Sequence, residues 1–154
     1  MKKTFPQHIL IAFVTSLILM LIGLAVTAFR ADFQIPTTWI DNALLVGSVP
    51  PAPVDPNNVF TSTGLFFGLA LGLGWVYADG GYQADGPVMK RVLRYVIGLV
   101  GVVILWMGLG EIFPRGDGIL VYTLRFIRYS LVGLWVTGGA PFLFKHFNLS
   151  NFSK

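Results

Sequence analysis

Four long apolar stretches occupy most of the chain, and they decide which solvent surrounds the folded protein. They run over about residues 9–29, 59–78, 92–113 and 119–147. A helix needs about 20 predominantly apolar residues to cross roughly 30 Å of hydrocarbon, so each stretch is long enough to span a bilayer. Four such helices would leave a small soluble chain without a water-facing surface. The sequence therefore predicts an all-α polytopic membrane protein, a single domain built as a bundle of four transmembrane helices.

The composition favours the same solvent. Hydrophobic residues make up 55% of the chain and charged residues 12%, whereas about 25% of residues are charged in ordinary soluble domains. The basic residues cluster at the ends of the apolar stretches, which is typical of membrane orientation rather than of nucleic-acid binding. The absence of cysteine excludes disulfides and thiolate metal ligands. We expect membrane lipids as partners, and no nucleic acid.

The first stretch resembles a signal peptide because Lys2 and Lys3 precede it. Its apolar run is 21 residues long, however, and the apolar region of a signal peptide has roughly 7–15 residues. We therefore interpret residues 9–29 as a signal-anchor helix that remains in the membrane.

Lysine and arginine near the ends of the stretches predict the orientation, because basic residues concentrate on the cytoplasmic side. One side holds Lys2, Lys3, Lys90, Arg91, Arg94, Lys145 and Lys154. The other side holds only Arg30 and Arg115. We therefore predict that both termini are cytoplasmic, and that residues 30–58 and 114–118 lie outside.

The long external connection between the first two stretches is rich in proline. Residues 50–53 read Pro-Pro-Ala-Pro, which favours extended backbone because proline biases the preceding residue away from helix. Residues 36–45 are predicted to form a short interfacial helix capped by Thr37 or Thr38. The connection is either an ordered linker lying on the bundle or a docking loop for a partner. The internal connection over residues 79–87 is predicted to be a flexible turn.

A ridge of small residues runs along the second stretch. Gly64, Gly68 and Gly72 repeat every four residues and therefore share one helical face. Such a ridge lets another helix backbone approach closely, which favours helix association in lipid. The third stretch adds Gly98, Gly101, Gly108 and Gly110, and the fourth adds Gly133, Gly138 and Gly139. We predict that the ridge is a helix-packing site, and its partner lies either in this chain or in another membrane subunit.

Charged residues within membrane stretches are candidates for function because each is costly there. Glu111 lies at the external end of the third stretch, beside Arg115, so we expect a solvated or arginine-paired carboxylate. Arg125 and Arg128 are three residues apart and share one face of the fourth stretch. We predict that these two bind a lipid phosphate or pair with Glu111 or Asp117. A carboxylate of a partner and a bound substrate are the alternatives.

Residues suited to a cofactor or a metal are scarce. His8 and His146 lie at the cytoplasmic ends of their stretches, whereas an axial haem or chlorophyll ligand belongs inside the bundle. No cluster of carboxylates and histidines has a spacing that suits a metal. Trp106 and Trp135 lie deeper in their stretches and are expected to pack between helices. The sequence predicts no catalytic residue, no cofactor site and no metal site.

Three segments carry a resemblance to a known family: residues 59–68, residues 94–116 with Gly-Leu-Gly at 108–110 and Phe-Pro-Arg-Gly at 113–116, and residues 124–141 with Leu-Arg-Phe-Ile-Arg-Tyr at 124–129. Together they resemble the non-catalytic carboxy-terminal membrane region of bacterial phosphatases of the type 2 phosphatidic acid phosphatase family. The resemblance implies a helical membrane-embedded region in a bacterial cytoplasmic membrane.

The catalytic core of that family has no counterpart in the sequence. The family uses a Lys…Arg-Pro motif, a Pro-Ser-Gly-His motif and a Ser-Arg…His…Asp motif. No Ser-Gly-His occurs here, and neither His8 nor His146 has the required neighbours. Because phosphoryl transfer needs a nucleophile, an acid and a phosphate clamp, no catalytic residue carries over.

Our leading hypothesis is a non-catalytic integral membrane subunit that packs against other membrane proteins as an accessory or structural component of a larger complex, such as a photosynthetic or respiratory assembly. The alternative is the membrane-anchoring half of a split lipid-phosphate phosphatase, in which Arg125 and Arg128 grip a headgroup. A small transporter is the third hypothesis, although the sequence places no charged residue near the middle of a stretch.

Overall fold

The structure is a computed structural model that describes residues 5–150. Its elements are all helical: α1 (Phe5–Phe29), α2 (Thr37–Leu45), α3 (Pro56–Ala78), α4 (Val88–Ile112), α5 (Ile119–Leu134), the π-helix η1 (Trp135–Gly139) and α6 (Ala140–His146). Within the described residues, four helices are long and apolar enough to cross a membrane: α1, α3, α4 and the continuous α5–η1–α6. The prediction of an all-α polytopic membrane protein is confirmed.

The spans end close to the predicted positions, but the first three begin earlier. The helices begin at Phe5, Pro56 and Val88, whereas the apolar stretches begin at 9, 59 and 92. Hydropathy marks only the part of a helix that lies in hydrocarbon, and its first turn can extend into the headgroup layer.

The N-termini of α2 and α3 differ in whether a side chain caps them. The predicted helix over residues 36–45 is present as α2, but it lacks the expected side-chain cap from Thr37 or Thr38. The N-terminus of α3 is capped by Asp55, whose side chain accepts a hydrogen bond from the amide of Asn57 at 2.8 Å. Pro56 fits the first turn of α3 because the amide hydrogen it lacks has no partner within a helix there.

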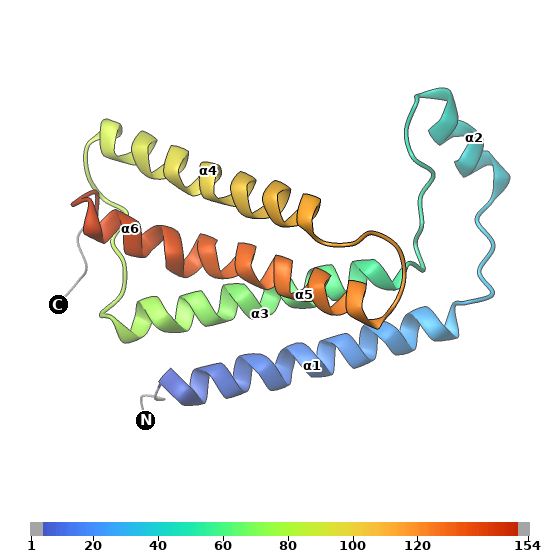
Figure 1. The fold of residues 1–154 in the computed structure, drawn as a ribbon, viewed down its shortest axis with the longest axis horizontal. Coiled ribbons are helices and arrows are strands. Elements are labelled where there is room, and N and C mark those ends of the chain that lie inside the picture. Colours follow the sequence, from blue (N-terminus) through green and yellow to red (C-terminus); the bar gives the residue numbers. More distant parts are fainter. Residues whose placement is uncertain (1–4, 151–154) are drawn as a thin grey trace.

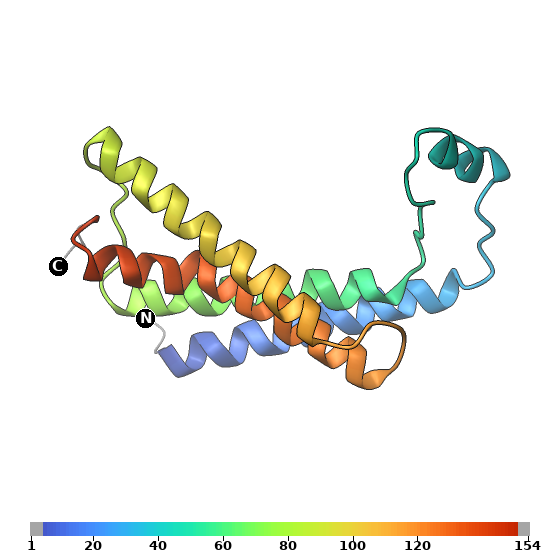
Figure 2. The ribbon, with the colours of Figure 1, turned by 45° about the horizontal axis from the view of Figure 1, so that its top comes forward.

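The helix α3 lies in the middle of the molecule, with α1 on one side and α5 and η1 on the other (Figure 1). The helix α4 packs against α5, η1 and α6, and it crosses them obliquely (Figure 2). The first helix begins and α6 ends at the same end of the molecule, which we call the α6 end (Figure 1). The helix α2 projects beyond the opposite end, the α2 end (Figure 1).

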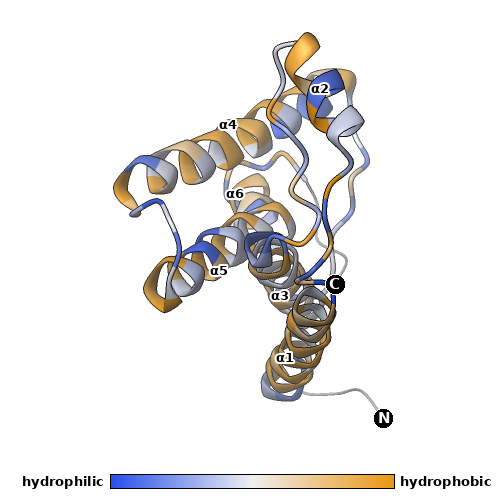
Figure 3. Ribbon diagram, turned by 90° about the vertical axis from the view of Figure 1, so that its right-hand side faces the viewer, coloured by the Kyte–Doolittle hydropathy of each residue, from blue (hydrophilic) through white to orange (hydrophobic). Residues whose placement is uncertain are grey.

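The outward faces of the long helices are largely apolar (Figure 3). Leu10, Leu21 and Ile104 are each more than 60% exposed. Exposing apolar surface to water costs roughly 25 cal/mol per Å², whereas lipid tails solvate it. The outer surface is therefore suited to hydrocarbon.

The fourth span contains a wider turn near its α6 end. The amide of Ala140 donates to the carbonyl of Trp135, five residues earlier, as in a π-helix. The next residue is Pro141, which lacks an amide hydrogen and whose ring crowds the carbonyl four residues before it. The π turn η1 relieves this crowding, so the span continues as α6 without breaking.

Candidate functional site

The glycine ridge of α3 faces α5 and η1. Gly64, Gly68 and Gly72 are buried. A Cβ at Gly64 would collide with the backbone of Phe126, and one at Gly68 with the backbone of Ser130. The two backbones are therefore in direct contact, which only residues without a side chain allow.

The fourth span contributes glycines to the same contact. A Cβ added at Gly133 would lie 2.6 Å from the carbonyl oxygen of Leu65. One added at Gly138 would lie 3.0 Å from the Cα of Gly72. We call the contact between these two sets of glycines the glycine seam: Gly64, Gly68 and Gly72 of α3, with Gly133 and Gly138 of the fourth span. The second set was not recognisable as a ridge in the sequence, because its glycines are five residues apart, and a spacing of five lies on one face only where the helix has a π turn.

Hydroxyl groups add hydrogen bonds from the neighbouring helices to α3. The Thr137 Oγ1 donates to the carbonyl of Leu69 at 2.9 Å. The buried Ser16 of α1 donates to the carbonyl of Thr63 at 3.0 Å. The central helix is thus joined through its own backbone carbonyls to both of its neighbours.

A buried arginine organises the α6 end. Arg94 of α4 is 6% exposed. Its guanidinium donates to the carbonyls of Ala84 and Asp85 and lies 3.4 Å from the hydroxyl of Tyr82. The predicted flexible turn over residues 79–87 is therefore held against α4 by this side chain. From the sequence, Arg94 contributes only to the prediction of orientation, because its partners are backbone carbonyls that no motif reveals.

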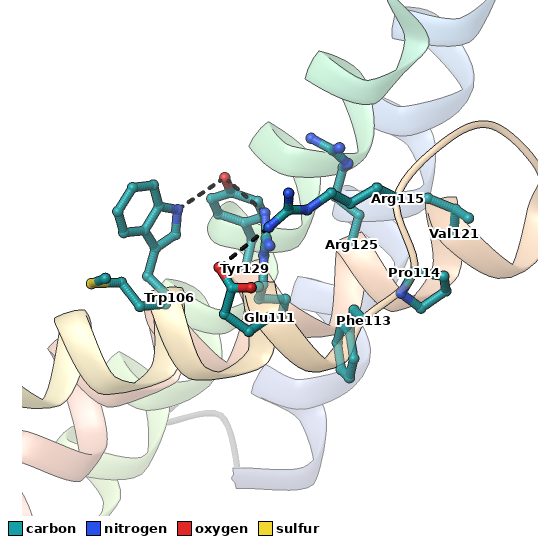
Figure 4. Close-up of a pocket in the computed structure, with 11 residues that line it drawn as sticks. Trp106, Glu111, Phe113, Pro114, Arg115, Val121, Arg125 and Tyr129 are labelled. Atoms are coloured by element: carbon teal, nitrogen blue, oxygen red, sulfur yellow. Dashed lines mark hydrogen bonds and ion pairs between the residues drawn. The ribbon is translucent and has the colours of Figure 1, made fainter.

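A cavity opens between α4 and α5 towards the α2 end, and we call it the arginine pocket (Figure 4). Its volume is about 370 Å³. Three arginines line it, Arg115, Arg125 and Arg128, together with Glu111, Trp106 and Tyr129. The fold brings them together because the 113–118 connection returns the chain directly from α4 into α5.

The carboxylate of the pocket pairs with Arg115. The Arg115 Nη2 lies 3.2 Å from the Glu111 Oε1, and both side chains are more than three-quarters exposed. An exposed pair of this kind contributes about 0–1 kcal/mol to stability. Asp117, the other acidic candidate, lies 3.4 Å from the hydroxyl of Tyr122. Within residues 5–150, neither carboxylate forms a salt bridge with Arg125 or Arg128.

The head of Arg128 lies among aromatic groups and glycine. Its Nη2 donates to the hydroxyl of Tyr129 at 3.3 Å, and its guanidinium carbon lies 4.9 Å from the centroid of the Tyr129 ring. The Nε1 of Trp106 lies 3.4 Å from the same hydroxyl. A Cβ added at Gly110 would lie 3.0 Å from Arg128 Nη1, so the glycine makes room for the guanidinium.

The deeper tryptophans differ from each other. Trp135 packs between helices as expected, since its Nε1 donates to the carbonyl of Gly98 at 3.0 Å. Trp106 is 51% exposed and reaches α5 through its Nε1 at the hydroxyl of Tyr129, so it lies at the edge of the contact between α4 and α5 rather than within it. It faces the rim of the arginine pocket.

The two histidines have different neighbours. His8 of α1 lies against Gly74 of α3, and the ring centroid of His146 is 5.3 Å from that of Phe147. Among residues 5–150, no group of three or more histidine, aspartate or glutamate side chains is placed to hold a metal ion.

Four apolar spans, a glycine seam and a pocket of arginines define a polytopic helical membrane protein. A comparison with family models matches residues 60–152, more than half of the chain, to the model described as "PAP2 superfamily phosphatase, transmembrane extension". The chain belongs to this family. The predicted resemblance to a membrane region of these phosphatases is confirmed. Neither the comparison with curated proteins nor the comparison with solved structures found a match.

Proposed function

We propose that the chain is a non-catalytic integral membrane component that packs against a membrane partner carrying phosphatase motifs. The observation that supports the proposal is the family itself, which is a transmembrane extension of phosphatases. The sequence contains no Ser-Gly-His, so the nucleophile and the acid of phosphoryl transfer have to come from elsewhere.

The partner has to use a surface other than the glycine ridge, because α5 already covers that ridge. We propose the outer face of α4. Only 6% of the residues in the most apolar stretch of α4 are buried inside the fold. A Cβ added at Gly98 or Gly108 would meet no atom within 4 Å, so the α4 backbone is open to close approach there.

Purification in a mild detergent, followed by mass spectrometry of the co-purifying chains, tests this function. We expect a membrane protein bearing the phosphatase motifs to be recovered with the chain. Gly98→Leu should reduce its recovery, because the bulky side chain separates the helices. Ala25→Leu is the control, since it adds a bulky side chain at an exposed position of α1, away from α4. Recovery of the chain as a lone monomer would overturn the proposal.

The second candidate is the membrane half of a split lipid-phosphate phosphatase, which the same family assignment favours. The two functions differ in whether the partner needs this chain for activity. The phosphatase activity of the partner should fall when the chain is removed if the enzyme is split. It should stay unchanged if the chain is an accessory subunit.

We further propose that the α6 end faces the cytoplasm of a bacterial inner membrane. The basic residues Lys90, Arg91, Arg94 and Lys145 support this orientation. The contributions expected from Lys2, Lys3 and Lys154 lie outside the described residues.

A further inference from the structure

Two arginines of the pocket have no anionic partner among residues 5–150. Among the described residues, Glu111 is the only carboxylate that lines the pocket, and it pairs with Arg115. Arg125 has no hydrogen bond or ion pair with any residue in the described range 5–150. The Nε of Arg128 is buried and has no hydrogen-bond partner within that range. The pocket therefore carries two positive charges that the described residues do not balance.

The depth of the arginines makes this imbalance costly. The fourth span has 28 residues, which gives a length of roughly 42 Å, so about 6 Å projects at each side of a hydrocarbon layer of ~30 Å. The Cα of Arg125 is roughly 9 Å from the start of α5 and that of Arg128 roughly 14 Å. With the span centred in the layer, the two Cα atoms would lie roughly 3 Å and 8 Å inside the hydrocarbon boundary, a depth from which a long side chain reaches towards the headgroup layer. A charge at this depth is retained when an anion neutralises it.

We propose that the arginine pocket binds a phosphate group, through the guanidinium groups of Arg125 and Arg128. The two arginines lie on one face of α5 and line a cavity of about 370 Å³. A guanidinium presents paired N–H donors that match two phosphate oxygens. Gly110 leaves room for the head of Arg128. The phosphate belongs either to an anionic lipid headgroup or to a free phosphate ion, and the inference does not depend on a phosphatase partner.

Lipid retention tests the site in the full chain. The chain is exposed to phosphatidylcholine vesicles with and without phosphatidic acid, purified in detergent, and analysed by native mass spectrometry for bound lipid. We expect phosphatidic acid to be retained, and the double change Arg125→Gln and Arg128→Gln to reduce its retention by tenfold or more, about tenfold for each charge-assisted hydrogen bond that is removed. Arg30→Gln is the control, because it removes one positive charge at the α2 end outside the pocket, and it is compared with the single change Arg125→Gln. If the pocket variant and the Arg30 variant lost the same amount of bound phosphatidic acid, the effect would come from the overall charge of the chain, and the proposal would be overturned.

Two further variants separate the shape of the pocket from its charge. Gly110→Leu keeps every charge but displaces the head of Arg128, so it should also reduce retention. Replacing both arginines with lysine keeps the charge and removes the paired donors, and should give a retention between those of wild type and the glutamine variant. If the glutamine variant does not fold, the lysine variant provides the test instead. Retention of phosphatidic acid by the lysine variant at the wild-type level would overturn the proposal.

Inorganic phosphate distinguishes the two sources. If the ligand is free phosphate, the ion should raise the melting temperature of the delipidated wild type more than that of the lysine variant. If the ligand is a lipid, the retention of phosphatidic acid should depend on the two arginines, and the effect of inorganic phosphate on the melting temperature should not. Absence of that dependence with both probes would overturn the phosphate site.

Discussion

Gly68 of α3 lies directly against the carbonyl group of Ser130 on α5, and a Cβ at position 68 would overlap that oxygen. The contact lies at the middle of the glycine seam, where the two central helices meet backbone to backbone. In lipid, association of helices depends on van der Waals contact and on hydrogen bonds between them. The absence of one side chain therefore sets the separation of the two helices at the centre of the molecule.

We predict that Gly68→Leu lowers the free energy of unfolding by at least about 1–3 kcal/mol, because the added side chain forces the helices apart. Gly108→Leu is the matched control, since a Cβ at that position meets open space. Leu69→Ala, at the neighbouring position on α3, should cost less than Gly68→Leu. Thermal unfolding in detergent measures all three. Equal melting temperatures for the two leucine variants would show that α3 and α5 do not meet at Gly68.

Thr137→Val should destabilise the protein by about 0.6 kcal/mol, the average for hydrogen bonds between membrane helices. Valine keeps the shape of threonine but lacks the donor to the carbonyl of Leu69. The control is Thr123→Val, because Thr123 donates only to Ile119 in its own helix. The difference in melting temperature between the two variants isolates the bond between the spans. No difference would mean that this bond does not contribute.

Arg94→Met should loosen the turn over residues 79–87. The methionine keeps an unbranched apolar stem and removes the donors to the carbonyls of Ala84 and Asp85. We expect hydrogen exchange in this turn to accelerate by about tenfold or more. Arg91→Met should have a smaller effect, since within the described part of the chain the exposed Arg91 donates to one carbonyl of the turn, that of Gly86. Comparable exchange in the two variants would argue against Arg94 as the group that holds the turn.

Single cysteines test the orientation, because the natural chain has none. A thiol reagent added outside the cell should label Pro53→Cys and should not label Gln83→Cys in the turn at the α6 end. Lys3→Cys and Phe152→Cys should also be protected, although both positions lie outside the described residues. The expected orientation rests on the asymmetry of the basic residues between the two ends of the spans. Labelling of position 83 from outside would show that the α6 end faces outwards, contrary to the proposed orientation.

The sequence by itself determined the solvent, the number of spans and the points at which they end. Hydropathy is a sum over consecutive residues, so it needs no knowledge of neighbours, and a helix in lipid satisfies its own backbone hydrogen bonds. The short helix α2 and the relationship to membrane phosphatases were also predictable, because each is carried by local sequence.

Only the tertiary structure decided which helix covers Gly64, Gly68 and Gly72, because a ridge read from sequence does not name its partner. The matching glycines, Gly133 and Gly138, are brought into register by a π turn that follows from the crowding at Pro141. The charges divide between the two levels. The pair of Glu111 with Arg115, one turn away, was among the expectations from the sequence, whereas the contacts of Arg94 with backbone carbonyls of a loop were not. Contacts of this kind depend on which faces of the helices meet, and that is a property of the packed helices rather than of any one of them.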